Sequence, residues 1–313
     1  MWLKSVRWIV LMVSLPAASL SLFSQAEGES EVTTVIIRKP VPAETLSVVP
    51  LQDGKVSVAS VSAEPSSGML PVQPPGSRNE DINHALIIGI DNYADPDITD
   101  LDNPVADATE LFNTLTSRYT FDSGNVVFLK DPGRAEIIDA LDRLSASLTS
   151  HDNLLIFYAG HGYWDAEKES GFWLPSDAAK NSTANWIRNS TIQDFVDGIR
   201  TQHTLLITDA CFAGSIFKTR GGFNDASVAV NKLYSLPSRK AMTSGTLEQV
   251  PDRSVFLEYL LKRLEDFDGK YLSSGDLFNS FREAVLNNSP NLPQYGVIQN
   301  TGDEGGEYIF IRR

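Results

Sequence analysis

The sequence contains only one cysteine in 313 residues, Cys211, so no disulfide can form within the chain. A chain of this length can bury enough apolar surface to be stable without one. The single thiol is therefore either a small buried hydrophobic group or a reactive side chain. A basic side chain brought next to it would favour the second interpretation.

Basic residues are also scarce. Lysine and arginine together number 26 against 40 aspartates and glutamates, which gives a net charge of −14 and a sequence pI of about 4.7. Nucleic acids and anionic membrane surfaces both require clustered positive charge, so neither is expected as a partner. An acidic surface instead suits basic peptides or proteins.

Several catalytic signatures are missing. No G-x-S-x-G elbow marks a serine hydrolase, and no P-loop marks a nucleotide-binding protein. One cysteine and four scattered histidines do not make a zinc site. We therefore expect no metal and no cofactor.

The N-terminus reads MWLKSVRWIVLMVSLPAASLSLFSQA, with Lys4 and Arg7 ahead of an apolar run and small residues near Ala26. This layout is typical of a cleavable secretory signal over residues 1–26, with a periplasmic or secreted product; an uncleaved membrane anchor is the alternative. Residues 27–80 are rich in Pro, Ser and Val and predict an extended linker or pro-segment. Residues 81–313 are expected to form one catalytic domain.

Apolar runs and amphipathic segments alternate through residues 81–313. The runs are HALIIGI, NVVFLK, DNLLIFYAG, HTLLITDA, RKAMTSG and the closing GEYIFIRR, and segments of helical spacing such as NPVADATELFNTLTSRY lie between several of them. This alternation predicts a three-layer α/β/α fold around a mostly parallel sheet of about six strands. In such sheets, functional residues gather where the strands end.

That rule separates the four histidines. His84 and His203 stand at strand beginnings, at the opposite pole of the sheet, and His151 falls at the end of a helix. Only His161, in YAGHGYW, follows a buried strand, as Cys211 does in TDACFAG fifty positions later. We therefore expect these two side chains at the same edge of the sheet.

An imidazole beside a thiol can accept its proton and later protonate a leaving amine. The glycines that flank His161, Gly160 and Gly162, would let a substrate backbone approach closely. The amides of Gly162 and Cys211 are candidate donors to an oxyanion. The alternative left open is that Cys211 is a core residue and AGHG a tight turn.

YAGHG and DAC-x-AG, together with ALIIGIDNY, LDNPVADATEL, GFWLPSDA, SRKAMTSG and GGEYIFI, resemble the caspase and metacaspase superfamily over residues 84–313. The resemblance implies that His161 is the general base and acid and Cys211 the nucleophile. It also implies that Asp107, Asp209 and Ser244 bind the substrate residue before the scissile bond. Two carboxylates would favour Arg or Lys there.

The sequence differs from the patterns of this superfamily in two places. The residues around Cys211 are not the Gln-Ala-Cys of true caspases, so cleavage after aspartate is not implied. Calcium-dependent metacaspases carry additional aspartates after the histidine, whereas here Asp177 is the one obvious candidate, and a calcium ion needs several oxygen ligands. We expect activity without calcium.

The polar stretch after Cys211 offers basic residues for self-cleavage. Arg220 is the favoured position, with Lys218 and Lys232 next, while Arg239 and Lys240 are expected to be protected within a strand. The rival to a peptidase is a catalytically weak or inactive scaffold or binding protein of the same fold. No oligomeric state is predicted.

Overall fold

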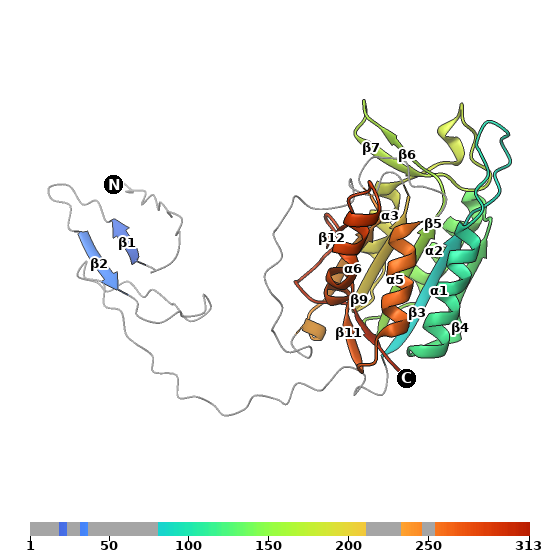
Figure 1. Ribbon diagram of the computed structural model, residues 1–313. Helices are drawn as coiled ribbons and strands as arrows, with labels where there is room; N and C mark the ends of the chain where they lie inside the picture. The colour runs from blue at the N-terminus through green and yellow to red at the C-terminus, as the bar shows by residue number, and fades with distance from the viewer. Residues whose placement is uncertain (1–18, 24–31, 37–80, 211–232, 246–253) are drawn as a thin grey trace, which may run out of the picture. The chain divides into compact units, whose positions relative to one another are not determined.

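The computed structural model describes residues 19–23, 32–36, 81–210, 233–245 and 254–313 (Figure 1). The chain divides into two units, Met1–Gly68 and Met69–Arg313. In the first unit, β1 (Ser19–Phe23) pairs antiparallel with β2 (Val32–Ile36). The rest of the predicted signal segment and linker, as well as Cys211, Lys218, Arg220 and Lys232, lies outside the described residues.

A six-stranded sheet organises the second unit. Its strands run in the order β12 (Gln294–Val297), β10 (Ser238–Thr243), β9 (His203–Asp209), β5 (Asp152–Ala159), β3 (Ile82–Gly89) and β4 (Phe121–Lys130). All neighbours are parallel except β10 and β12, which are antiparallel. The predicted fold, with a mostly parallel sheet of about six strands, is confirmed.

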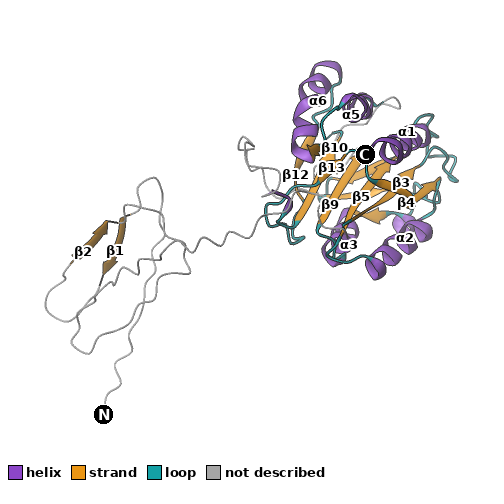
Figure 2. Ribbon diagram, turned by 90° about the horizontal axis from the view of Figure 1, so that it is seen from below, coloured by secondary structure: helices purple, strands orange, loops and turns teal. Residues whose placement is uncertain are grey.

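Helices cover both faces of this sheet, as Figure 2 shows. The helices α2 (Arg134–Ser147) and α3 (Asn189–Gly198) lie on one face, and α1 (Pro104–Arg118), α5 (Val255–Asp266) and α6 (Ser274–Asn288) lie on the other. Every residue of β5 and β9 is buried, which explains why their sequences read as continuous apolar runs rather than alternating ones. The buried core therefore has two halves, one on each face of the sheet.

Two features of the fold differ from the sequence-based expectation. The sixth strand of the sheet is β12, which the hydrophobic pattern did not reveal. The predicted last strand exists as β13 (Ile309–Ile311), but it pairs with β11 (Tyr271–Ser273) in a separate two-stranded sheet. A pattern of apolar residues predicts a strand but not its partner.

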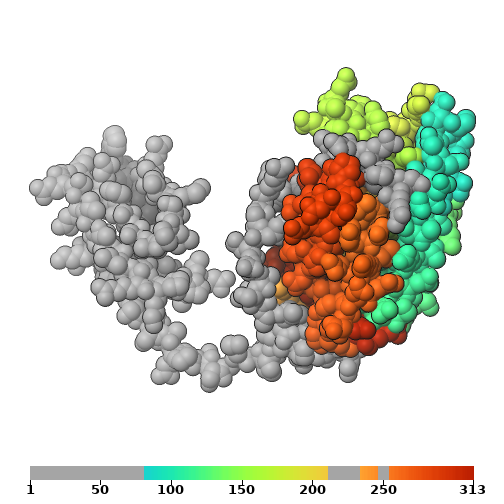
Figure 3. All heavy atoms as spheres, viewed as in Figure 1, coloured from blue at the N-terminus to red at the C-terminus, as the bar shows by residue number. Residues whose placement is uncertain are grey.

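The polar segment that follows His161 forms a small antiparallel sheet. Its strands are β6 (Gly162–Asp165), β7 (Ser170–Trp173) and β8 (Ile187–Arg188), with a 3-10 turn η2 (Thr183–Asn185) before the last of them. In the space-filling view this hairpin projects beyond the main body of the domain (Figure 3). The segment that follows His161 is therefore an ordered, protruding hairpin.

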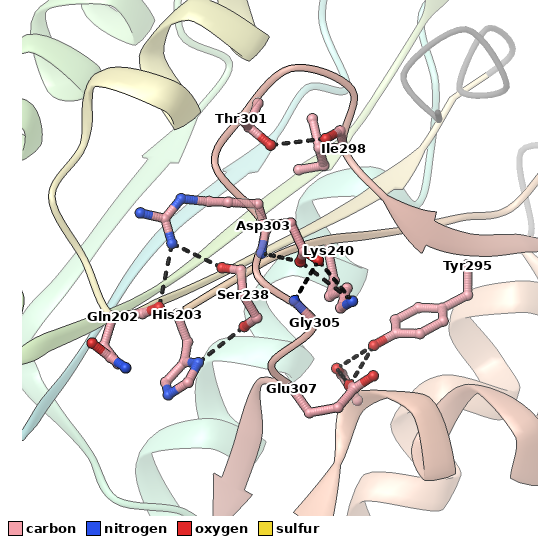
Figure 4. Close-up of polar contacts among 12 residues, drawn as sticks. Gln202, His203, Ser238, Lys240, Tyr295, Ile298, Thr301, Asp303, Gly305 and Glu307 are labelled. Atoms are coloured by element: carbon pink, nitrogen blue, oxygen red, sulfur yellow. Dashed lines mark hydrogen bonds and ion pairs between the residues drawn. The ribbon is translucent and has the colours of Figure 1, made fainter. Parts of the chain in front are cut away.

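Asp303 fastens the beginning of β10 to the C-terminal part of the chain (Figure 4). Its Oδ2 accepts a hydrogen bond from the Arg239 amide at 2.8 Å, and its Oδ1 accepts one from the Gly305 amide at 3.0 Å. Its carboxylate also lies 3.3 Å from the ammonium of Lys240, with both side chains nearly buried. A buried charge is tolerated only when it is paired in this way.

The residues just before β10 are held by the same C-terminal loop. The carbonyl of Leu233 accepts from the Glu307 amide at 3.2 Å, and the carbonyl of Pro237 accepts from the Glu304 and Gly306 amides at 3.1 and 3.2 Å. Arg239 and Lys240 lie within the buried strand β10, as expected. Residues 233–240 are thus fixed along their whole length.

Among the residues that the structure describes, no helix has the length and apolarity needed to cross a membrane.

Candidate active site

The parallel pairing of β5 with β9 determines which side chains meet at the carboxyl edge of the sheet. Ala159 is the register partner of Asp209, and the Gly160 amide reaches the Asp209 carbonyl at 3.5 Å. His161 stands two residues beyond Ala159. Cys211 follows two residues beyond Asp209 but lies outside the described part of the chain. Neighbouring strands of a sheet are about 4.8 Å apart, so these two positions follow adjacent strand ends.

The other three histidines lie at the opposite pole. His84 is near the start of β3, and the carbonyl of His151 accepts from the first residue of that strand. His203 opens β9, fully buried, with its ring nitrogens 3.0 Å from the Ser238 hydroxyl and 3.1 Å from a backbone carbonyl. Burial lowers the pKa of His203 to about 3, so this ring is a neutral structural group.

His161 is held in place through its backbone. Its amide donates to the Tyr93 hydroxyl at 2.7 Å, and its carbonyl accepts from the Tyr158 hydroxyl at 2.7 Å and the Leu174 amide at 3.1 Å. Tyr158 in turn stacks on Trp173, with ring centroids 4.3 Å apart. The backbone of His161 is therefore fixed by bonds from three different segments.

The imidazole of His161 is oriented by a backbone carbonyl. Its Nε2 lies 2.7 Å from the carbonyl oxygen of Thr99, and the Tyr93 ring packs against it at 4.9 Å. Because a carbonyl can only accept, Nε2 must carry the proton. Nδ1 is then the basic nitrogen of the neutral ring, available to take a proton from a neighbouring group.

The loop that carries Thr99 is held by carboxylates that accept backbone amides. Next to Thr99, Asp100 accepts from the Tyr93 amide at 2.8 Å, which links the carbonyl that orients the ring to the hydroxyl that holds its backbone. At the start of the loop, the amides of Asp91 and Asn92 and the Asn92 side chain donate to Asp131, which directly follows β4. Burial alone would raise the pKa of Asp131, but these hydrogen bonds outweigh it and lower the pKa.

Gly160 is required by the close packing around His161. Its φ of 156° is one that other residues rarely adopt, and a Cβ there would lie 3.1 Å from the Tyr93 hydroxyl and 3.2 Å from the Tyr158 hydroxyl. Both hydroxyls bond the backbone of His161. A side chain at position 160 would therefore displace the groups that place the imidazole.

The amide of Gly162 faces away from the neighbouring strand. The Leu174 amide donates to the His161 carbonyl, so the hydrogen-bonding positions between the strands fall at this pair, although the His161 amide itself bonds Tyr93. The next pair, Gly162 with Trp173, is then of the non-hydrogen-bonded type. This orientation leaves the Gly162 amide able to donate to a substrate oxygen.

Asp209 and Ser244 are brought together at the ends of β9 and β10. Both continue the rows of side chains that face α1, α5 and α6, since Ile207 and Met242, two residues earlier, pack on that side. Asp209 and Ser244 are both buried, and the Ser244 hydroxyl interacts with the Asp209 carboxyl, although Asp209 Oδ1 itself accepts no hydrogen bond from a described residue. A buried carboxyl oxygen without a described hydrogen-bond donor is a group that a bound ligand can satisfy.

Burial raises the pKa of Asp209 to about 6. The hydroxyls of Ser244 and of Ser254, which precedes α5, face the carboxyl and lower its pKa in part, but the effect of burial is larger. No cation among the described residues offsets it. Within the described part of the chain, the Asp209 carboxyl therefore has no counter-ion.

Asp107 stands in the first turn of α1 and is half-buried. The start of that helix packs tightly on the end of β3, because a Cβ at Gly89 would lie 2.7 Å from the Pro104 carbonyl. This contact brings Asp107 to the edge and the face of the sheet that Asp209 occupies.

Asp177 is occupied in helix capping. Its Oδ1 accepts from the Arg134 amide at 2.8 Å in the first turn of α2, and its carboxyl packs on Gly133. Within the described ranges, no group of three or more His, Cys, Asp or Glu side chains could hold a metal ion. Asp177 therefore has a structural role as the acceptor for the first turn of α2.

The sequence did not reveal three residues of this site, namely Tyr93, Thr99 and Ser254. Thr99 contributes a backbone carbonyl, which leaves no trace in residue type. Tyr93 lies in the quoted ALIIGIDNY segment, yet its role depends on a hydroxyl that meets the His161 backbone 68 residues away in sequence. Only tertiary structure brings these groups together.

The chain is similar to a known protein family. The model of the family Peptidase_C14, caspase domain, matches residues 82–301, which is more than half of the chain. The chain is also similar to Metacaspase-1 of Saccharomyces cerevisiae, in strains YJM789 and S288c, at 37% identity over 86 residues. That stretch is 25% of this chain and only 19% of the yeast protein.

Among solved structures, protein GSU0716 from Geobacter sulfurreducens is similar, with a TM-score of 0.48 and 15% identity. The similarity covers 72% of this chain and 99% of that one.

The raised pKa predicts that Asp209 destabilises the folded protein near neutral pH. An acid whose folded pKa is raised contributes stability that is full below its ordinary value of 3.8 and is lost as the pH rises through about 6. Replacing Asp209 by Asn removes this dependence. At pH 7.5, Asp209→Asn should therefore unfold at a higher temperature than wild type. Its free energy of unfolding should be greater by about 3 kcal/mol at most, and this difference should shrink on acidification.

Thermal unfolding of both proteins between pH 5 and 8 measures this, with Asp107→Asn, which keeps Asp209, as the control that should retain the pH dependence of wild type. An Asp209→Asn protein that is less stable than wild type at pH 7.5 would show that the carboxylate has a structural partner.

Proposed function

Because the chain belongs to the caspase-domain family, we propose that it is a cysteine endopeptidase in which Cys211 is the nucleophile and His161 the general base and acid. The observation that carries the proposal is the placement of His161. Its ring is fixed at the carboxyl end of β5 with Nδ1 as the basic nitrogen, beside the strand end that leads to Cys211. A fixed base next to a thiol is the arrangement that nucleophilic catalysis needs.

In this mechanism His161 takes the thiol proton, and the thiolate sulfur bonds to the carbonyl carbon of the substrate. The carbonyl oxygen becomes an oxyanion, for which the amides of Gly162 and Cys211 are the donors. When the carbon–nitrogen bond breaks, the nitrogen keeps the electron pair and takes the proton from the imidazolium, which leaves a thioester. Water then adds to the thioester, giving its proton to His161, and the acid product and free thiol are restored.

The Thr99 carbonyl has a defined part in these steps. It holds the Nε2 proton in place, so only Nδ1 exchanges protons with thiol, leaving nitrogen and water. It also stabilises the imidazolium that forms when Nδ1 is protonated, since the charged ring makes a stronger hydrogen bond to the same oxygen. The ring therefore needs no rotation during the cycle.

The substrate residue before the scissile bond is Arg or Lys in this proposal. Among the described residues, the buried Asp209 carboxyl lacks both a counter-ion and a hydrogen-bond donor to its Oδ1. A guanidinium or ammonium would satisfy both and would favour the ionised carboxylate. Asp107, at the start of α1, is the second acidic residue of this subsite.

Alanine variants of the dyad test the proposal. With short peptides bearing Arg before a fluorogenic leaving group, His161→Ala should lower kcat by roughly 10²–10⁴-fold, and Cys211→Ala should abolish turnover. Asp209→Asn should lower kcat/KM for the Arg substrate by roughly 10²–10³-fold while the protein stays folded. Full turnover in the dyad variants would contradict the proposed mechanism. A wild-type protein that binds these peptides without cleaving them would indicate a scaffold or binding protein instead.

Self-cleavage is a second expected reaction, within the connection between β9 and β10. Its basic residues are tethered close to the site, which raises their effective concentration. Lys232 directly precedes a segment that begins with Leu233 and ends with Pro237. The carbonyls of these two residues accept hydrogen bonds from the C-terminal loop. A substrate must extend freely on both sides of the cleaved bond, so this anchoring disfavours Lys232 and favours Arg220 or Lys218.

Incubation of purified protein should thus give a fragment that ends at Arg220 or Lys218, and mass spectrometry identifies the cut. Arg220→Gln should slow or shift the cut, whereas Lys232→Gln should leave it unchanged. The same fragments from Cys211→Ala would show that another protease makes them. An intact wild-type chain would remove self-cleavage from the account.

A further inference from the structure

Tyr163 is an exposed aromatic side chain next to the proposed catalytic base. Its side chain is 46% exposed, which makes it one of four large hydrophobic residues with substantial exposure among the described residues. It lies in β6, on the ordered hairpin that projects from the domain in Figure 3. Single exposed aromatics are common on protein surfaces, so exposure alone assigns no role.

One side of the Tyr163 ring packs against other aromatic residues. It packs on Trp186 at 4.9 Å, and Trp186 packs on Phe172 at 5.6 Å. Trp186 is buried, and its indole nitrogen donates to the Ala179 carbonyl at 3.0 Å. A fixed, half-exposed aromatic ring loses little conformational entropy when a ligand covers it.

The position of Tyr163 relative to His161 is set by the strand. The ladder with β7 continues to His161 through the Leu174 amide, so the chain is extended from 161 to 163. Residues two apart in an extended chain project on the same side, at a spacing of about 7 Å. Tyr163 therefore lies beyond His161 on the side to which the imidazole projects.

The order of the strands defines the path of a peptide across this edge. Asp209 and Ser244, at the ends of β9 and β10, are proposed to hold the residue before the scissile bond. His161, at the end of β5, must reach the leaving nitrogen to protonate it. The peptide then runs from β10 over β9 to β5, and its next residues continue towards β6.

We propose that Tyr163 is a specificity-determining residue that binds an apolar or aromatic side chain at the second position after the scissile bond. One extended residue covers about 3.3 Å, so a chain that leaves His161 reaches Tyr163 at that position. The inference rests on the proposed peptidase function, because the leaving nitrogen fixes the path. It adds a contact on the leaving-group side of the substrate, away from the acidic subsite.

Kinetics on two kinds of substrate test this contact. Peptides with Arg before the bond carry either Phe or Gly at the second position after it, and a third substrate ends in a coumarin amide without residues there. Tyr163→Ala should lower kcat/KM for the Phe peptide about fivefold and bring the ratio of Phe to Gly peptides close to one. Cleavage of the coumarin amide should not change, and Tyr163→Phe should keep the wild-type ratio.

A matched control is Ile82→Ala, because Ile82 is 45% exposed but stands at the opposite end of the sheet. It should leave the ratio of the two peptides unchanged. Loss of the same ratio in the Ile82 variant, or an unchanged ratio in Tyr163→Ala, overturns the proposal.

A binding measurement separates this inference from the proposed chemistry. In the Cys211→Ala background, fluorescence anisotropy of labelled Phe and Gly peptides reports affinity without turnover. Tighter binding of the Phe peptide that disappears with Tyr163→Ala supports the contact even if the wild type cleaves neither peptide. Equal affinities for the two peptides, with Tyr163 present, contradict it.

Discussion

The pairing of β5 with β9 is the constraint on which the candidate site depends. Parallel strands in register deliver their carboxyl ends to one edge, and here that register matches Ala159 with Asp209. His161 and Cys211 each follow two residues later. A shift of register by one residue would turn the side chains of one strand to the opposite face. The complete burial of both strands opposes such a shift, because it would move large apolar side chains into the wrong half of the core.

Stability and the proposed binding role oppose each other at Asp209. The fold keeps a carboxyl group in a buried place where burial raises its pKa to about 6 and no described cation compensates it. At the other pole of β10, by contrast, Asp303 is paired with Lys240 and accepts backbone amides. The same residue type is thus satisfied where it fastens the fold and left unsatisfied where a ligand is proposed. Unsatisfied groups of this kind concentrate at functional sites.

Much of the fold could be predicted because long buried strands and amphipathic helices leave strong patterns. β3, β5 and β9 are continuous apolar runs, and the rule that function gathers at strand ends singled out His161 among four histidines. β12 could not be predicted in the same way, since it has four residues and follows two prolines within six positions. The pairing of β13 with β11 depends on the end of the chain returning to α6, which no local pattern records.

The candidate site was predictable to the extent that it depends on side-chain type. His161, Asp209 and Ser244 lie at the edge that the sequence indicated, whereas the Thr99 carbonyl and the Tyr93 hydroxyl emerge only from the loop between β3 and α1. That loop is ordered by aspartates whose pattern in the sequence resembles an ordinary acidic turn. The backbone carbonyl and the hydroxyl that hold His161 are therefore the part of the site that only the structure could reveal.

Covalent labelling with a peptidyl-arginine chloromethyl ketone tests the central claim most directly, because the reagent needs both the basic side-chain subsite and an activated nucleophile. Mass spectrometry of the digested product should show one adduct per chain, on Cys211. Labelling should be slowed strongly by His161→Ala and should not occur with the corresponding aspartyl reagent. An adduct at another residue, or equal labelling of Cys211 in wild type and His161→Ala, would contradict the account.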